Sequence, residues 1–180
     1  MDVFARHGYH GATVDDIVAG SSSSKGAFYH YFTSKQGIFL TLLDRLAGLV
    51  EAGVEAAIAV EEGGLAKVEA ALRVVLDVAA EHRGLTRILL IEAAALGPEF
   101  EQSRLGIHRR FAALIQRHLD RAVADGAIPP QDTALAAAAW IGAINETITQ
   151  TLARDGDLRA VLPGLRAFLL RSVGAAGATA

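Results

Sequence analysis

The apolar pattern between residues 38 and 58 restricts the possible folds of this chain more than any other feature. Apolar residues recur there mostly every third or fourth position, which is the period of an α-helix that buries one face. Thr33 and Gln36 resemble a capping box at the start, and Gly63-Gly64 forms a break after the end. The pattern therefore predicts one long helix over residues 34–60. Its apolar positions are Ile38, Phe39, Leu42, Leu43, Leu46, Leu49, Val50, Val54 and Ile58.

The rest of the chain is also predicted to be helical, with glycine and proline at the breaks. The same periodicity predicts helices over residues 65–81, 85–96, 99–125, 132–154 and 162–173. Gly97 and Pro98 mark one break, because glycine favours the position after a helix and proline the first turn of the next. No segment alternates polar and apolar residues as a strand would. We predict an all-α fold in which the long helix joins an N-terminal module, residues 1–50, to a C-terminal helical body, residues 51–180.

Composition excludes several classes of protein. Hydrophobic residues make up 52% of the 180, which is enough material for a buried core. The absence of cysteine excludes disulfides and thiolate sites, and the first residues lack the basic and apolar regions of a signal peptide. No apolar run is long enough to span a bilayer. We expect a cytoplasmic protein with no membrane partner.

Enzyme and metal chemistry have no supporting pattern in the sequence. The six histidines include no His-x-x-x-His pair, and His108 and His118 are too far apart to predict a shared metal. The chain also has no glycine-rich phosphate loop and no nucleophile elbow. We therefore expect no catalytic residues, no metal and no cofactor, in a protein that is not an enzyme.

The first twenty residues predict two short helices. Residues 1–7 have helical spacing, and Gly8 gives the stop signal that glycine supplies after a helix. Thr13 and Asp16 form a capping-box pattern, with aspartate in place of the usual glutamate or glutamine, that opens the second helix. The first helix is too short to be stable alone. We expect either that it begins further upstream or that the module lacks part of its support.

A polar turn then leads into a helix with two chemically different faces. Phe28 and Phe32 lie four residues apart and form an apolar stripe, whereas Lys25 and Tyr29 form a stripe of hydrogen-bond donors on another face. The serines at residues 21–24 offer N-caps beside free backbone N–H groups, which attract phosphate. Helix, turn and helix together predict DNA binding.

Bulk charge does not supply this binding. The formal net charge is −3, and residues 1–50 carry four lysines and arginines against four acidic residues. Because nonspecific affinity for DNA grows with the number of phosphates neutralised, a neutral module depends on a few placed donors and on a second copy. The alternative interpretation of the same donors is ordinary surface charge with a half-buried tyrosine.

Three short motifs resemble the DNA-binding module of the TetR/AcrR family of regulators. They are residues 4–9 (FARHGY), 13–17 (TVDDI) and 24–32 (SKGAFYHYF), the last followed by Ser34-Lys35. The resemblance implies an all-helical homodimer whose N-terminal modules bind two half-sites of palindromic operator DNA. It also implies that the C-terminal bodies bind a small-molecule inducer.

The resemblance assigns a role to each matching position of the module. Thr13 would cap its helix against a phosphate, and Lys35 would hold another phosphate at the start of the long helix. Residues 24–26 would lie at the groove-facing start of the recognition helix, where glycine lets the backbone approach the duplex closely. Tyr29 and His30 would contact the DNA backbone or base edges. The expected DNA contacts are therefore Thr13, Ser24, Lys25, Gly26, Tyr29, His30 and Lys35.

The chain departs from the family pattern in the turn. Ser22 and Ser23 stand where the family usually has glycine and an apolar residue, and serine at both positions is expected to loosen the module by ~1–3 kcal/mol. The family also usually has a longer first helix, preceded by a polar or basic arm. These departures leave a second hypothesis open, a helical ligand-binding or dimerisation protein whose DNA-binding module is impaired.

The body is expected to hold an apolar ligand pocket with a few convergent polar groups. Polar residues within apolar stretches, and the aromatic residues near them, are the candidates. For each of them the alternative is ordinary structure: a solvated face, a satisfied core histidine, a helix-packing hydrogen bond or a core ring. The candidate ligand residues are Glu92, His108, Phe111, Trp140 and Asn145.

Two helices are candidates for a dimer interface. Small residues between 134 and 142 would let another helix approach closely, and the last helix has a strong apolar face. Packing within one chain is the alternative, and the resemblance favours the dimer. The candidate interface residues are Leu135, Ala139, Gly142, Leu165, Phe168 and Leu169. In the resulting hypothesis, a repressor releases its operator when an inducer moves the long helix and changes the spacing of the two modules.

Overall fold

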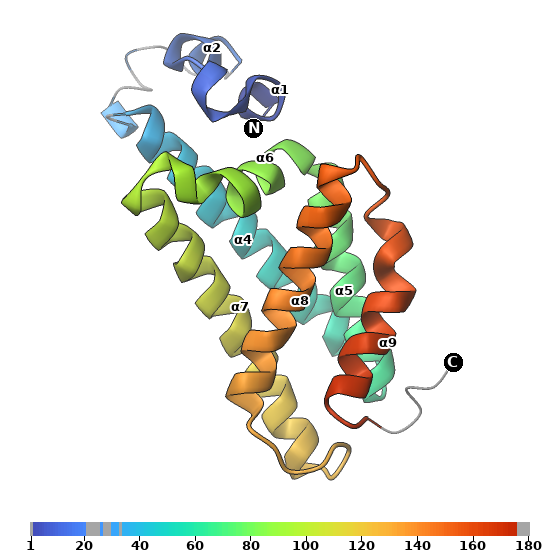
Figure 1. Ribbon diagram of the computed structural model, residues 1–180. Coiled ribbons are helices and arrows are strands. Elements are labelled where there is room, and N and C mark those ends of the chain that lie inside the picture. The colour runs from blue at the N-terminus through green and yellow to red at the C-terminus, as the bar shows by residue number, and fades with distance from the viewer. Residues whose placement is uncertain (1, 21–25, 27–29, 33, 176–180) are drawn as a thin grey trace.

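The computed structural model describes residues 2–20, 26, 30–32 and 34–175, and every regular element in this part of the chain is a helix (Figure 1). The predicted all-α fold is confirmed. The longer helices are α1 (Asp2–Gly11), α2 (Val14–Ala19), α4 (Lys35–Ala59), α5 (Gly64–Glu81), α6 (Arg83–Arg87), α7 (Pro98–Ala124), α8 (Thr133–Ala153) and α9 (Leu162–Ser172). Short turns lie between some of them, at Ile88–Glu92, Ala93–Leu96 and Arg159–Val161.

The long predicted helix forms as α4, which has 25 residues. Its N-cap is Ser34, whose hydroxyl accepts a hydrogen bond from the Gly37 backbone N–H at 3.1 Å. Thr33 of the predicted capping box lies outside the described residues, and the observed cap is the next residue, Ser34. Since Gly37 has no side chain, no reciprocal bond returns to the cap.

The backbone geometry at Gly8 confirms the predicted interruption of the helix, but the helix does not end there. Gly8 has φ 65° and ψ 179°, in the left-handed half of conformational space that favours glycine. Helical backbone resumes after it and continues to Gly11, so α1 is two short helical pieces joined by a kink.

The segment predicted as one helix over residues 85–96 is three different turns. The α-helical turn of α6 passes into a π-helical turn, Ile88–Glu92, and then into a 3-10 turn, Ala93–Leu96. Ile88 and Ala93 are both 1% exposed. They lie five residues apart, which is the step of a π-helix, whereas a regular α-helix would have turned Glu92 toward the core. The π turn therefore keeps a carboxylate off the buried face.

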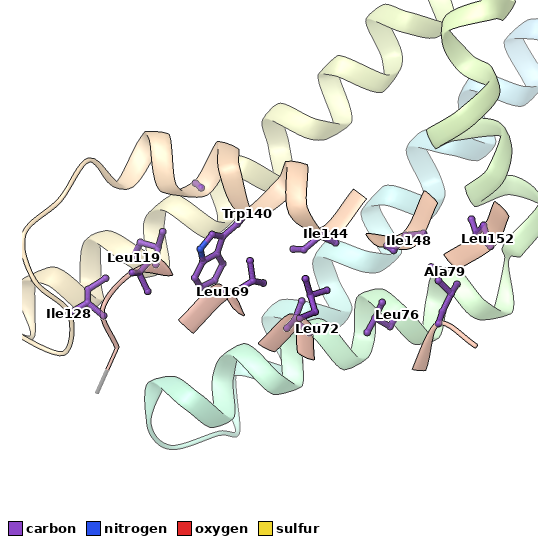
Figure 2. Close-up of a cluster of buried hydrophobic side chains, with 14 residues drawn as sticks. Leu72, Leu76, Ala79, Leu119, Ile128, Trp140, Ile144, Ile148, Leu152 and Leu169 are labelled. Carbon is purple, nitrogen blue, oxygen red and sulfur yellow. The ribbon is translucent and has the colours of Figure 1, made fainter. Parts of the chain in front are cut away.

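The body is a layered bundle in which α4 packs on α5 and α7, α7 packs on α8, and α9 packs on α5 and α8. The largest buried cluster joins α5, α8 and α9, and Figure 2 shows Trp140, Ile144, Ile148 and Leu152 of α8 along one side of it. A second cluster joins α1 to the body through Phe4, which is 1% exposed. The module formed by α1 and α2 thus sits at one end of the bundle (Figure 1).

The boundary expected near Val50 lies within α4. Val50 is 8% exposed and packs with Val54 and Leu114 of α7, so one continuous helix belongs to both parts. The division into residues 1–50 and 51–180 stays a prediction. In the described part of the chain, no helix combines the length and the apolar composition that crossing a bilayer requires.

Candidate nucleic-acid interface and ligand cavity

The start of α2 is fixed by the predicted capping box, which is confirmed. The Thr13 hydroxyl accepts a hydrogen bond from the Asp16 backbone N–H at 3.1 Å, and the Asp16 carboxylate accepts from the Thr13 backbone N–H at 3.2 Å. The same carboxylate accepts from the Thr13 hydroxyl at 2.5 Å. These bonds from Thr13 hold the pKa of Asp16 below its usual range. The role of Thr13 at a phosphate stays a prediction, and its hydroxyl proton is already engaged.

Lys35 closes the far end of α1. Its ammonium donates to the backbone carbonyls of Tyr9 at 2.9 Å, His10 at 3.3 Å and Ala12 at 3.0 Å. It also lies 4.6 Å from the centroid of the Tyr9 ring. A lysine has three N–H donors, so these carbonyls take its full capacity and satisfy groups that a helix end leaves unpaired. The phosphate contact expected of Lys35 stays a prediction, and it requires that some of these bonds be exchanged.

A group of aromatic rings joins the module to the body. Tyr9 of α1 lies edge to face against Phe39 of α4, with centroids 5.3 Å apart, and against Phe100 of α7, with centroids 4.9 Å apart. Phe4 also packs on Phe39, at 4.9 Å. Burial raises the pKa of the Tyr9 phenol. No spacing rule predicted this role for Tyr9, although the residue belongs to the first of the three short motifs.

Four residues of the expected recognition segment are described. Gly26, His30 and Tyr31 are helical and exposed, whereas Phe32 follows the helix and packs, partly buried, on the second core cluster. A Cβ added at Gly26 would meet no atom of the described residues within 4 Å, so their packing does not require glycine there. Tyr31 is 78% exposed and stacks edge to face on His30 at 5.4 Å, and sequence reasoning had not singled it out. The expected contacts at Ser24, Lys25 and Tyr29, and the serines at 21–23, lie outside the described residues.

The body contains a large, partly open cavity of about 1210 Å³. It is lined by α4, α5, α7 and α8, with further residues from α9. Along α4 the lining runs from Leu43 to Ala59, which is about 24 Å of helix at 1.5 Å per residue. Apolar side chains make up most of the wall, as expected of a site for a small organic ligand.

The expected ligand residues divide into three groups. Phe111, Trp140 and Asn145 line the cavity. His108 lies behind Asn145, in a groove on the outer side of α7 and α8, where the two side chains are hydrogen bonded at 3.0 Å. Glu92 lines neither the cavity nor the groove. All five assignments stay predictions, and for Glu92 the π turn gives a structural reason for its position.

Comparison with known proteins places the chain in a family. Residues 1–42 match the model of bacterial regulatory proteins of the tetR family, and residues 61–149 match a tetracyclin repressor-like C-terminal domain. The chain belongs to the TetR family of transcriptional regulators. Members of this family regulate transcription and are not enzymes, which agrees with the sequence-based prediction.

Curated relatives of this TetR-family regulator match it over part of their length. The regulator EthR of Mycolicibacterium smegmatis is 30% identical over 129 residues, which are 68% of this chain and 58% of EthR. The repressor AcnR of Corynebacterium glutamicum is 46% identical over 39 residues, which are 22% of this chain and 21% of AcnR. The chain therefore spans less than two thirds of the length of each.

Solved structures of the family match the whole fold. The fatty acid degradation regulator FadR of Bacillus halodurans has a TM-score of 0.84 at 22% identity, covering 94% of this chain and 92% of FadR. FadR of Bacillus subtilis, solved in complex with stearoyl-CoA, has a TM-score of 0.83 at 23% identity, covering 93% of this chain and 92% of that one. At this identity the likeness concerns the fold.

The turn after α4 and the end of α7 lie at the end of this TetR-family fold that is away from α1 (Figure 1). The charged cavity-lining residues Glu62, Lys67, Arg121 and Asp125 come from this turn, from the start of α5 and from the end of α7. His118 also lines the cavity, and its buried Nε2 has no hydrogen-bond partner among the described residues. Sequence reasoning missed this charged end, because its members come from three separate segments.

Ion pairs connect the long helix to α7 on the outside of the bundle. Arg110 binds Glu51 with two nitrogens, at 2.9 Å and 2.7 Å, and also binds Asp44. Arg117 binds Glu55 at 2.8 Å. Hydrogen bonds to Glu51 and Asp44 raise the pKa of Arg110. These partners stand on α4 at positions 44, 51 and 55, so the pairs follow the same helix that lines the cavity.

The candidate dimer residues fall into an exposed group and a buried group. Leu135 and Phe168 are 67% and 54% exposed, and Ala139 and Gly142 are exposed as well. Leu165 and Leu169 are instead buried in the core of their own chain, with Leu169 at 0% exposure. The prediction for these two is corrected to packing within one chain. The apolar face of α9 is real, but most of it is used against α5 and α8.

Proposed function

We propose that this TetR-family regulator is a ligand-responsive repressor that binds palindromic operator DNA as a homodimer and releases it when a small molecule enters the body. One observation carries the proposal: α4 both lines the cavity and anchors the DNA-binding module. Its residues from Leu43 to Ala59 border the cavity, and Lys35 at its start holds the end of α1.

Small movements of α4 are large enough to release DNA. A helix of 25 residues is about 37 Å long, so a tilt of about 5° displaces one end by about 3 Å. Two recognition helices must reach successive major grooves about 34 Å apart, and polar contacts fail when their distance grows by about 1 Å. A ligand that fits the cavity only when α4 is tilted therefore shifts the population away from the DNA-binding state.

The exposed face of α8 and α9 supports the homodimer. Leu135, Ala139, Gly142 and Phe168 are exposed small or apolar residues, and a Cβ at Gly142 would meet no neighbouring atom of the described residues within 4 Å. A symmetry-related pair of these helices would form a four-helix interface. The two modules would then be held at a fixed spacing.

The cavity supports an elongated and largely apolar ligand. Its wall is mostly aliphatic and aromatic, and its charged end contains both Lys67 and Arg121. FadR of Bacillus subtilis, which shares the fold, was solved with stearoyl-CoA, and this is consistent with a long-chain compound in such a body. The DNA partner also implies a cytoplasmic site of action.

The experiment is a fluorescence anisotropy titration of duplex DNA from the region upstream of the coding sequence, at several salt concentrations. We expect salt-dependent binding of the dimer, which is lost when Lys25→Ala and Tyr29→Ala are combined. Long-chain acyl compounds, stearoyl-CoA among them, are expected to weaken it. Unchanged affinity in the double variant would contradict the assigned contacts.

The second hypothesis is tested in the same titration. A chain that binds no duplex at low salt, yet still binds apolar ligands, would be a helical ligand-binding protein whose DNA-binding module is impaired. The same titration is then repeated with the chain extended upstream to the previous in-frame start. If the first helix is only too short, the longer chain regains DNA binding. If the module has lost its function, the longer chain does not bind DNA either.

A further inference from the structure

Four polar side chains form a hydrogen-bonded row that runs from the surface of α7 to the wall of the cavity. Glu101 accepts two hydrogen bonds from Arg104, at 2.7 Å and 2.6 Å. A third nitrogen of Arg104, Nη1, lies 3.3 Å from His108 Nδ1. His108 Nε2 in turn lies 3.0 Å from the amide of Asn145 on α8. The row thus has a fixed order of groups, and its last member lines the cavity.

In this row, whether each group donates or accepts a hydrogen bond follows from the group next to it. Arg104 only donates, so the nitrogen of His108 that faces it, Nδ1, must accept. Burial, and secondarily the positive charge of Arg104, lowers the pKa of His108, which keeps the ring neutral near pH 7. A neutral imidazole that accepts at Nδ1 carries its proton on Nε2. The atom next to Nε2 must therefore be an acceptor. Because Nδ2 of Asn145 stands there, the side-chain amide has to turn by half to present its oxygen instead.

This assignment fixes which end of the Asn145 amide is left for a ligand. A half-turn of the Asn145 side-chain amide exchanges its oxygen and nitrogen without changing the positions they occupy. With the oxygen held by His108, the NH₂ group takes the other position, and the contact with His108 is the one hydrogen bond of this side chain among the described residues. Asn145 lies in the wall shared by the cavity and the outer groove, together with Leu90 and Ile141.

The other polar groups in this part of the cavity are already engaged. The Thr86 hydroxyl donates to the His82 carbonyl at 3.1 Å. The Trp140 indole N–H donates to the Ser172 hydroxyl at 3.0 Å, which leaves only the ring for the cavity wall. Among the described residues that line the cavity near Trp140 and Thr86, Asn145 thus keeps donor capacity for a ligand, apart from the charged end and His118.

We propose that Asn145 is a specificity-determining residue that donates its amide N–H to a hydrogen-bond acceptor on the ligand, and that His108 is the residue that orients it. The ligand is then an apolar molecule with an acceptor such as a ketone, ester or amide carbonyl partway along its length. This inference rests on the proposed ligand-binding function of the same cavity. A molecule of equal shape without the acceptor is disfavoured, because it leaves the amide N–H unpaired in an apolar site.

The test compares probes of similar size in the full-length protein. Undecan-2-one carries a carbonyl, 2-methylundec-1-ene replaces it by a carbon–carbon double bond, and 2-heptylpyrrole carries an N–H donor and no comparable acceptor. Trp140 is the chain's single tryptophan and lines the cavity, so its fluorescence reports occupancy. We expect the wild type to bind the ketone about tenfold more tightly than the alkene, which is the effect of one buried hydrogen bond.

Variants separate specificity from folding. Asn145→Leu is expected to abolish the preference for the ketone while the alkene still binds. His108→Leu is expected to reduce the ketone preference and to strengthen binding of the pyrrole, since the freed amide can then present either end. A loss of packing alone would weaken all three probes together. Gln150→Leu removes an exposed amide from the same helix, outside both cavity and groove, and should leave the preference unchanged.

The outcomes distinguish this inference from the proposed function. Equal affinities of the wild type for ketone and alkene, or a preference for the pyrrole, would overturn the assignment of Asn145 and leave the ligand-binding cavity standing. Absence of binding by every probe, with no change in Trp140 fluorescence, would overturn both.

Discussion

The two ends of α4 are joined to their neighbours by different chemistry. Near its start, Lys35 donates to three carbonyls of the α1 segment, and Phe39, at 0% exposure, lies among rings from α1 and α7. Further along, α4 is joined to α7 by exposed ion pairs, while its apolar face borders the cavity. The first set combines buried aromatic packing with partly exposed hydrogen bonds of Lys35, and the second set is exposed to water.

This difference teaches how one helix can transmit a signal. Close packing resists deformation, whereas exposed ion pairs contribute little and re-form easily at a new spacing. We infer that the start of α4 moves with the DNA-binding module as one body, and that its cavity-lining part shifts against α7. The predictions below disturb each end in turn.

The largest effect on the free energy of unfolding is expected near the start of α4. Phe39→Ala removes the ring that contacts Phe4 and Tyr9, and the resulting cavity should lower the free energy of unfolding by about 3–5 kcal/mol. Urea denaturation measures the loss, and DNA affinity should fall with it. Leu49→Ala on the same helix is the matched control, since Leu49 is 54% exposed and its loss should cost less than about 0.5 kcal/mol. Similar costs for both variants would mean that the junction is not tightly packed.

Replacing Lys35 distinguishes a clamp from a phosphate contact. Lys35→Met should lower the free energy of unfolding by about 1–2 kcal/mol, because three carbonyls lose a charged donor. A lost phosphate contact would reduce the slope of log affinity against log salt by about 0.9 for each protomer, whereas a lost clamp leaves that slope unchanged.

Lys35→Arg is the sharper variant. Arginine keeps the charge that a phosphate needs, but its planar donors cannot replace a single ammonium that reaches three carbonyls. If Lys35 acts as a clamp, Lys35→Arg should be destabilised nearly as much as Lys35→Met. Full stability together with a preserved salt slope would support the phosphate role instead.

The sequence predicted the helices well because their apolar period is local information. The breaks at Gly8 and Gly97 followed from the backbone preferences of glycine, and both residues have positive φ. The π turn was not predictable in this way. It depends on which of Ile88, Glu92 and Ala93 the neighbouring helices bury, and the periodicity of the segment alone does not contain that information.

The candidate site was predictable in its residue types and less so in its contacts. Lys35 was predicted to contact phosphate, whereas the carbonyl partners that it has in the structure lie 23 to 26 residues away. His108 and Asn145 were both singled out, although their contact spans 37 residues and no local rule pairs them. For Leu165 and Leu169 the sequence predicted an apolar face and left open which surface covers it.

Along the cavity-lining part of α4, removing an ion pair to α7 should change the free energy of unfolding little and the response of DNA binding to ligand more. Arg110 is 40% exposed on its side chain, so Arg110→Met should cost no more than about 1 kcal/mol and the cost should vanish at high salt. Because the variant releases α4 from α7, we expect a long-chain acyl compound to dissociate the DNA at lower concentration. Anisotropy titrations at low and high salt measure both effects.

Arg73→Met is the matched control for Arg110. Arg73 also forms an exposed ion pair, but its partner Glu69 lies on the same helix, α5. Its removal should leave the response of DNA binding to ligand unchanged. An equal change in both variants would show that the response depends on overall charge and not on the contact between α4 and α7.

The smallest expected effect is a pH dependence of the free energy of unfolding, caused by His108 in the body. Burial first, and Arg104 second, lower the folded-state pKa of His108 below its unfolded value of about 6.5, while Glu101 opposes them weakly and Asn145 is uncharged. The unfolded chain then binds the proton more readily, so the stability contributed by neutral His108 is present above about pH 6.5 and is lost as pH falls toward the folded-state pKa. His108→Leu should reduce this acid-side loss, and Arg104→Met should reduce it partly, because desolvation remains.

Urea denaturation of the three proteins between about pH 7 and pH 5 measures the difference. If the wild type and His108→Leu lose stability in parallel over that range, the ring is not held neutral by its surroundings, and the donor order that it imposes on Asn145 loses its basis.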